Sequence, residues 1–286
     1  MNLAISTPTE NSKHLKLIED LLLIFILICS TSLQNNWWHV KFTLLMILLI
    51  THFTNWRFKF PLIFWGLTVL FTSLDLFDYY FVIANHSFVL LYFTTILFIS
   101  YIFPQDRIKI IQINGLSVLL LIMFWGATQK VISPEFMSGD YISSLTLKGD
   151  LFKPLQIANV IPDAFAKNIS LINENLKNAP SADTTIQLHT PFKKFGVYSL
   201  YFSIFIVVAE FAMVPILLLK NEKIKHTLLL LFLSGLLLTR FETGFISLLI
   251  ILSISQLPVG EKNFKLLYLL LLAACLSLIL IKIGAR

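Results

Sequence analysis

Long runs of apolar residues, separated by short polar segments, make up most of the chain. An α-helix rises about 1.5 Å per residue, so about 20 apolar residues suffice to cross the hydrocarbon core of a bilayer. The pattern predicts an all-α protein, a polytopic transmembrane bundle of about nine spans. The expected spans are residues 17–33, 41–56, 58–75, 80–103, 110–132, 196–219, 225–239, 242–256 and 264–282.

The seventh and eighth predicted spans are short for a bilayer. Arg240, Glu242 and Gly244 interrupt what would otherwise be one apolar stretch between residues 225 and 256. Polar backbone at membrane depth is tolerated where protein or a cavity surrounds it. The sequence therefore leaves open whether this stretch is two spans or a re-entrant pair.

The first apolar run has some features of a secretory signal peptide. Lys13 and Lys16 precede the apolar residues 21–28, as the basic residues of a signal peptide precede its apolar region. Glu19 and Asp20 stand directly before the run, however, and the next apolar segment follows closely. We therefore expect a retained first helix.

The connection at residues 131–195 is the one long polar segment, and we expect it to fold in water. This divides the chain into helices 1–5 at residues 1–130, a loop region at 131–195 and helices 6–9 at 196–286. Within the loop, apolar residues recur at helical spacing behind Pro162, which predicts an amphipathic helix. These residues are Ile161, Phe165, Ile169, Ile172 and Leu176, and the polar residues Asp163, Lys167, Asn168, Glu174 and Lys177 fall elsewhere.

Composition supports a membrane location, since 57% of the residues are hydrophobic and 13% are charged. A soluble domain of this length could not hide so much apolar surface in one core. The formal charge of +6 comes from basic residues spread over the connections, so nucleic-acid binding is not indicated. Cys29 and Cys275 lie in apolar stretches and are expected to pack as free thiols.

The distribution of basic residues predicts the orientation, because Lys and Arg accumulate on the cytoplasmic side. One side collects Lys13, Lys16, Arg57, Lys59, Arg107, Lys109, Lys220, Lys223, Lys225, Lys262 and Lys265. We therefore expect a cell-membrane protein with a cytoplasmic N-terminus. The loop at 131–195 is then extracytoplasmic, and an odd number of spans places the C-terminus outside.

Several common chemistries have no counterpart in the sequence. It has no phosphate-binding or dinucleotide-binding glycine loop, no Cys and His cluster of zinc type and no serine nucleophile elbow, and no metal is expected. Paired broken helices in matching positions are also missing, which makes a secondary transporter a weaker alternative.

Ionisable residues near the ends of spans are the candidates for function, because they are expensive to keep in a membrane. Lys130 ends the fifth predicted helix and His86 begins the fourth, both near the outer boundary. A lysine partly withdrawn from water can act as a general base, and His86 could share its site. The alternatives are a lysine that extends to the headgroups and a histidine that is satisfied at the interface.

Further polar and aromatic residues could complete this pocket or serve structure alone. Asn85, Trp125, Arg240 and Glu242 are predicted on the outer side, where they could bind a cofactor or solvate helix ends. Glu210 lies about 21 Å from the outer end of its helix, at 1.5 Å per residue, which implies that it is too deep to reach Lys130. By depth its expected partners are His52 and Asn114, in a buried polar cluster.

Two strings in the sequence resemble the vitamin K-dependent gamma-carboxylase and its bacterial membrane-domain relatives, the HTTM proteins. The first, Asn85-His86-Ser87-Phe88, is similar to the Asn-His-Ser-Tyr entry to a spanning helix of that family. The second is Gly126 and Lys130, followed by Ser133-Pro134-Glu135-Phe136 and Gly139, with Phe136 where the family has Trp. Glu210 and the Pro215 that follows resemble a later helix of the bacterial relatives.

The resemblance implies a function for these residues. In the family, a lysine deprotonates reduced vitamin K, which reacts with oxygen to form an epoxide and a base strong enough to prepare a glutamate side chain for carboxylation. Carried over, Lys130 is the base and His86 its partner, with a reduced, vitamin K-like lipid quinone as cofactor. A protein or peptide substrate would then bind at the extracytoplasmic face, through the loop at 140–195 or a partner protein.

Two other functions remain open on the sequence alone. A non-enzymatic protein, such as an immunity or assembly component, would keep the family fold without the chemistry and would point Lys130 at the headgroups. A small transporter or channel would use Glu210 and His52 as an intramembrane relay.

Overall fold

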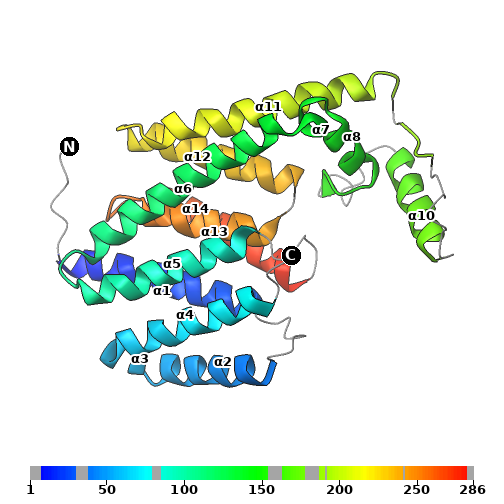
Figure 1. Cartoon of the computed structure of the whole chain (residues 1–286). Coiled ribbons are helices and arrows are strands. Elements are labelled where there is room, and N and C mark those ends of the chain that lie inside the picture. Colours follow the sequence, from blue (N-terminus) through cyan, green and yellow to red (C-terminus); the bar gives the residue numbers. More distant parts are fainter. Residues whose placement is uncertain are drawn as a thin grey trace. The chain divides into compact units, whose positions relative to one another are not determined.

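The structure is a computed structural model of the chain, and the residues it describes are 8–29, 38–78, 85–153, 163–177, 187–190, 192–240 and 242–281. Every regular element within these ranges is helical (Figure 1). The helices of the first half are α1 (Pro8–Cys29), α2 (Trp38–Phe53), α3 (Trp56–Lys59), α4 (Pro61–Asp78), α5 (Asn85–Ile102) and α6 (Arg107–Ile132). They are followed by α7 (Pro134–Met137), α8 (Asp140–Leu147), α10 (Asp163–Lys177), α11 (Phe195–Leu217), α12 (Glu222–Thr239), α13 (Thr243–Ser255) and α14 (Asn263–Leu280).

Each of the nine predicted segments overlaps one of these helices, so the all-α prediction is confirmed. Among the described residues, three helices are long and apolar enough to cross a membrane, namely α6, α11 and α14. Four further apolar helices are shorter, and they lie at Trp38–Phe53, Pro61–Leu74, Ser87–Ile102 and Thr243–Ser255. The number of spans therefore stays a prediction.

Local sequence explains several helix ends. Pro134 occupies the first turn of α7, where its missing N–H would have no helical partner in any case. The Ser133 hydroxyl caps the same helix by accepting a hydrogen bond from the Phe136 N–H at 3.2 Å. Asn221 caps α12 in the same way, through the Ile224 N–H at 3.2 Å. The chain between α6 and α8 is thus fixed in a tight turn.

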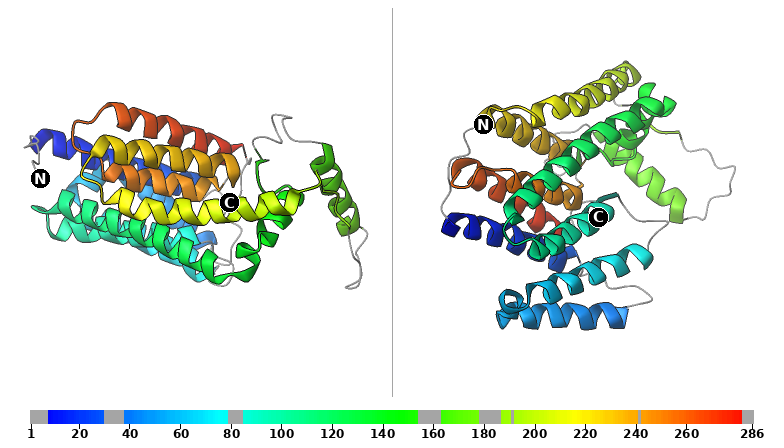
Figure 2. Two further views of the ribbon diagram at one scale, coloured as in Figure 1. Left: turned by 90° about the horizontal axis from the view of Figure 1, so that it is seen from above. Right: turned by 60° about the vertical axis from the view of Figure 1, so that its left-hand side comes forward.

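The chain divides into two compact units, and the first contains residues 1–119 and 243–284. Its centre is α13, in which every residue except Phe245 is buried. This helix packs on α14, α1 and α5, while α4 pairs with α5 and α2 (Figure 2). At 13 residues, α13 is about 20 Å long and apolar on all sides, as expected of a helix enclosed by other helices.

Close contact with two side chains explains one glycine of the first unit. A Cβ atom at Gly115 would lie 2.7 Å from the Ser255 hydroxyl and 2.8 Å from the Gln256 amide nitrogen. The same amide nitrogen donates a hydrogen bond to the Gln112 carbonyl at 2.9 Å. Glycine at this position therefore lets the first half of α6 approach the end of α13.

The second unit contains residues 120–242. Here α7 and α8 lie along α11, α12 lies beside α11, and α10 contacts α8. The core consists of Phe136, Ile142, Leu151 and Val207. Gly139 has φ +83°, and a Cβ atom there would lie 2.5 to 2.9 Å from backbone atoms of Ser199 and Leu200. The turn before α8 can therefore pack directly on the α11 backbone.

Helix α10 is the helix predicted in the long connection, although Ile161 and Pro162 lie outside the described residues. Lys167, Glu174 and Lys177 are exposed as expected. Asn168 departs from the prediction, because its side chain is fully buried. Its amide donates to the His189 carbonyl at 2.9 Å and accepts from the His189 N–H at 2.8 Å. These two bonds satisfy the amide and fix residues 187–190 against the helix.

Candidate functional site

Lys130 lies in the last turn of α6 and forms an ion pair with Glu210 of α11, within the second unit. Its ammonium donates to both carboxylate oxygens, with Nζ 2.8 Å from Oε1 and 2.7 Å from Oε2. A third, longer contact joins Nζ to the Gly126 carbonyl at 3.4 Å. The Lys130 ammonium therefore binds a carboxylate, which differs from the alternative in which this side chain extends to the lipid headgroups.

The pairing corrects the expectation that Glu210 is too deep to reach Lys130. That expectation placed the outer ends of the two helices at one level. In the structure, α7 and α8 continue from α6 along the first turns of α11, so Gly139 lies against Ser199 and Leu200. Glu210 follows Ser199 and Leu200 by eleven and ten residues, which is about 16 Å along the axis of α11. Lys130 therefore meets α11 about four turns from its first residue.

Glycine and aromatic residues of the second motif string surround the ion pair. A Cβ atom at Gly126 would lie 3.5 Å from Oε2 of Glu210 and 3.7 Å from Nζ of Lys130. The Phe136 ring centroid lies 5.8 Å from Nζ, within the range of a cation–π contact. The capped turn at Ser133 carries Phe136 to this position. Gly126 and Phe136 of this string thus lie beside the Lys130 ammonium group.

The pair is largely but not completely shielded. The side-chain exposures are 18% for Lys130 and 12% for Glu210. Two opposite charges in such a setting stabilise each other and exchange little with solvent. Chemically, the ammonium can donate a hydrogen bond to a hydroxyl group that is brought to the pair, and the carboxylate can accept one from it.

The other residues proposed around Lys130 are only partly described. His86 and Asn85 begin α5, but their side chains lie outside the described residues. Trp125 is on α6 and 53% exposed. It precedes Lys130 by five residues, which turns it about 140° around the helix axis. Trp125 therefore does not share the face of α6 that carries the ion pair.

Arg240 and Glu242 also form an ion pair, with Nε 2.8 Å from Oε1. Both side chains are well exposed, at 43% and 34%, so this pair adds little stability. It follows the end of α12, where the Thr239 carbonyl accepts a 2.7 Å hydrogen bond from the Phe152 N–H. The position agrees with the alternative that these charges solvate a helix end.

The predicted cluster of Glu210, His52 and Asn114 stays a prediction, because Glu210 lies in the second unit and the other two residues lie in the first. Glu210 binds Lys130 in the second unit. In the first unit, Asn114 accepts a 2.8 Å hydrogen bond from the Tyr92 hydroxyl. Glu210 and Asn114 therefore each have a hydrogen-bonding partner within their own unit.

Sequence reasoning missed a charged network in the first unit. The buried carboxylate of Glu19 accepts from the Tyr101 hydroxyl at 2.7 Å and from the Arg107 guanidinium at 2.6 Å. Its neighbour Asp20 pairs with Arg57 at 2.5 Å. Glu19 and Asp20 were noted only as an interruption before an apolar run. The sequence signal for the partners of these two carboxylates was the presence of basic residues directly after later predicted spans.

No family model, curated protein or solved structure matches this chain. The ion pair is therefore interpreted from its own chemistry and from the sequence strings that resemble the gamma-carboxylases. Of the residues in those strings, Lys130 belongs to the pair, Gly126 and Phe136 lie beside it, and Ser133 caps the turn that carries Phe136. This arrangement is the best candidate for a functional site among the described residues.

Proposed function

We propose that the chain is a multi-pass cell-membrane protein of the gamma-carboxylase and HTTM type, which oxidises a reduced lipid quinone at Lys130. The N-terminus is cytoplasmic and the connection at residues 131–195 is extracytoplasmic in this proposal. Lys130 is the base and His86 its partner. The observation that carries the proposal is the gathering of Gly126, Lys130 and Phe136 of one motif string around a shielded ion pair.

In this proposal the pair carries the proton that leaves a quinol hydroxyl until a proton is returned to form water. Glu210 takes a proton from the Lys130 ammonium, and the neutral amine then removes the proton of a quinol hydroxyl. Oxygen is the oxidant. One of its atoms enters the quinone ring as the epoxide. The other leaves as water with two hydrogens, one from the second quinol hydroxyl and one returned by Glu210, which restores the ion pair. The Glu210 carboxylate at 2.7 Å is close enough for the first transfer to need no intervening water.

The surroundings are compatible with a quinone ring. Phe136 is buried beside the ammonium, and Phe124 and Phe211 contact each other edge to face at 6.1 Å on the same two helices as the ion pair. Phe124 is half exposed, as a residue facing lipid would be. Aromatic walls beside a few polar groups are typical of sites for flat apolar cofactors.

The test is epoxide formation by purified protein in lipid, supplied with reduced vitamin K and oxygen. Lys130→Gln removes the amine but keeps a side chain that can donate to Glu210. Lys220→Gln is the matched control, because it makes the same change at an exposed lysine of the same unit. All variants are compared at equal amounts of folded protein.

The proposal predicts epoxide from wild type and from Lys220→Gln, and at least a hundredfold less from Lys130→Gln, as expected when a general base is lost. Epoxide formed equally by Lys130→Gln would exclude Lys130 as the base. Failure of the wild type to form epoxide would favour the non-enzymatic alternative, in which the ion pair serves only to hold α6 against α11.

A further inference from the structure

A second group of charges lies in the first unit, around the short helix α3 between α2 and α4. Arg57 of α3 is buried, with a side-chain exposure of 5%, and its Nη2 atom contacts Asp20 of α1 at 2.5 Å. The other two guanidinium nitrogens, Nε and Nη1, are buried and have no hydrogen-bond partner. Buried donors without acceptors are costly, so this arginine has unused capacity to bind an oxyanion.

Further basic groups surround Arg57. Lys16 of α1 is exposed, and its Nζ lies 5.3 Å from the centroid of the Phe58 ring. The Arg57 guanidinium carbon lies 4.4 Å from the same centroid, so both cations share one ring. Nδ1 of His52, at the end of α2, is also buried without a partner. Asp20, which Arg57 contacts, is a negatively charged group beside these basic residues.

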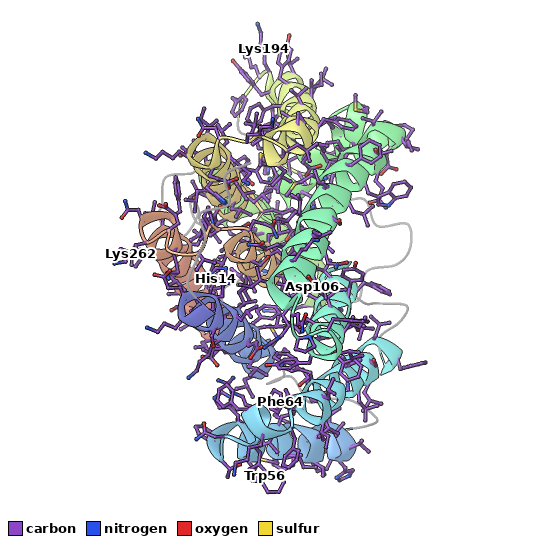
Figure 3. The ribbon with its side chains drawn as sticks, turned by 90° about the vertical axis from the view of Figure 1, so that its left-hand side faces the viewer. His14, Trp56, Phe64, Asp106, Lys194 and Lys262 are labelled. Carbon is purple, nitrogen blue, oxygen red and sulfur yellow. The ribbon has the colours of Figure 1, made fainter. Side chains whose placement is uncertain are left out.

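The sequence of this turn alternates aromatic and basic residues, from Trp56 to Phe60. Trp56 is 54% exposed, Phe58 47% and Phe60 49%, and Lys59 is exposed as well. Figure 3 shows Trp56 at the outer edge of the helices around it. Exposed aromatic and basic residues at one helix end are typical of the interface between lipid tails and headgroups.

We propose that Lys16 and Arg57 form a binding site for the phosphate of an anionic phospholipid. The phosphate accepts hydrogen bonds from Nε and Nη1 of Arg57, and Lys16 supplies a second cation at the surface. Phe58 covers the guanidinium group and is exposed enough to turn aside when the headgroup enters. The predicted topology places this turn at the cytoplasmic surface, where anionic lipids attract basic residues. The site is independent of Lys130.

The experiment titrates phospholipid into the purified full chain in neutral detergent and measures bound lipid by native mass spectrometry. Phosphatidylglycerol is compared with phosphatidylcholine, and inorganic phosphate is tested as a competitor. Lys16→Gln removes an exposed cation, and Arg57→Lys keeps the charge and the contact with Asp20 but loses the guanidinium fork. Lys109→Gln is the matched control, because Lys109 is an exposed lysine of the same unit and the same predicted side.

We expect phosphatidylglycerol to bind at least fivefold more tightly than phosphatidylcholine. Lys16→Gln and Arg57→Lys should each weaken phosphatidylglycerol binding about fivefold, and Lys109→Gln less than twofold. Equal weakening by all three variants would overturn the site in favour of diffuse positive charge. Competition by inorganic phosphate at similar concentration would overturn the lipid as its occupant. If Arg57→Lys does not fold, Lys16→Gln against Lys109→Gln decides the outcome.

Discussion

Removing the Glu210 carboxylate is expected to destabilise the protein more than any loss of an exposed charge. Glu210→Ala leaves the Lys130 ammonium with one long hydrogen bond, to the Gly126 carbonyl at 3.4 Å, and the cation–π contact with Phe136 at 5.8 Å. Breaking a fully buried ion pair from one side costs about 3–5 kcal/mol. The side-chain exposures of 18% and 12% allow some relief by water or lipid headgroups, so we expect about 3 kcal/mol.

A double variant separates the cost of the orphaned charge from that of lost packing. Lys130→Met with Glu210→Leu replaces both charges by apolar side chains of similar volume, which is often neutral or stabilising. We therefore expect the double variant to lie within about 1 kcal/mol of wild type. Glu242→Gln shows how much stability is lost when one charge of an exposed ion pair is removed. We expect this variant to change stability by about 1 kcal/mol or less.

The assay is reversible denaturant unfolding in mixed micelles, followed by helix content, for the wild type and the three variants. The reasoning predicts that Glu210→Ala unfolds much earlier than wild type and that the double variant recovers most of the loss. If Glu210→Ala behaved like Glu242→Gln, the ion pair would not be shielded as described. If the double variant were no better than Glu210→Ala, packing and not an unpaired charge would explain the loss.

Three further predictions concern local features. Gly139→Ala should destabilise by about 1–2 kcal/mol or more, because the residue has φ +83° and a Cβ atom would meet the Leu200 backbone at 2.5 Å. Gly196→Ala, on α11 with no atom within 4 Å of its Cβ position, should instead stabilise by up to about 1 kcal/mol. Thermal unfolding in detergent measures both. Burial, with a smaller contribution from Lys265, lowers the pKa of His14 to about 4. The unfolded chain then binds more protons between pH 6.5 and 4, so stability is full above about pH 6.5 and falls by up to about 3 kcal/mol toward pH 4. A flatter pH profile in His14→Gln checks this, and an unchanged profile contradicts it.

The helices could be predicted because their signal is local. Apolar runs and polar or proline breaks fix where a helix begins and ends, so α6 and α11 lie close to the predicted residues 110–132 and 196–219. The amphipathic pattern behind Pro162 likewise predicted α10. The prediction that Asn168 is exposed was wrong, because an amide can be buried when backbone groups form hydrogen bonds with it. The sequence did not show that the backbone of His189 would form these bonds.

The partners of the candidate site could not be predicted in the same way. Lys130 and Gly126 share a helix face by spacing alone, whereas the contact with Glu210 depends on how α7 and α8 lie along α11. That arrangement follows from the close approach at Gly139, a contact between residues far apart in the sequence. The charges of the residues alone could not identify ion-pair partners either. Glu19 and Arg107, for example, are separated by 88 positions and still form an ion pair.

A charge swap tests most directly whether Lys130 and Glu210 form a functional site. Lys130→Glu combined with Glu210→Lys keeps the ion pair but moves the amine from α6 to α11. We predict a stability within about 1 kcal/mol of that of wild type, because an ion pair is retained. We also predict no epoxide from reduced vitamin K under conditions in which wild type forms it, because the base has left its position. A folded swap variant as active as wild type would contradict the assignment of Lys130 as the base.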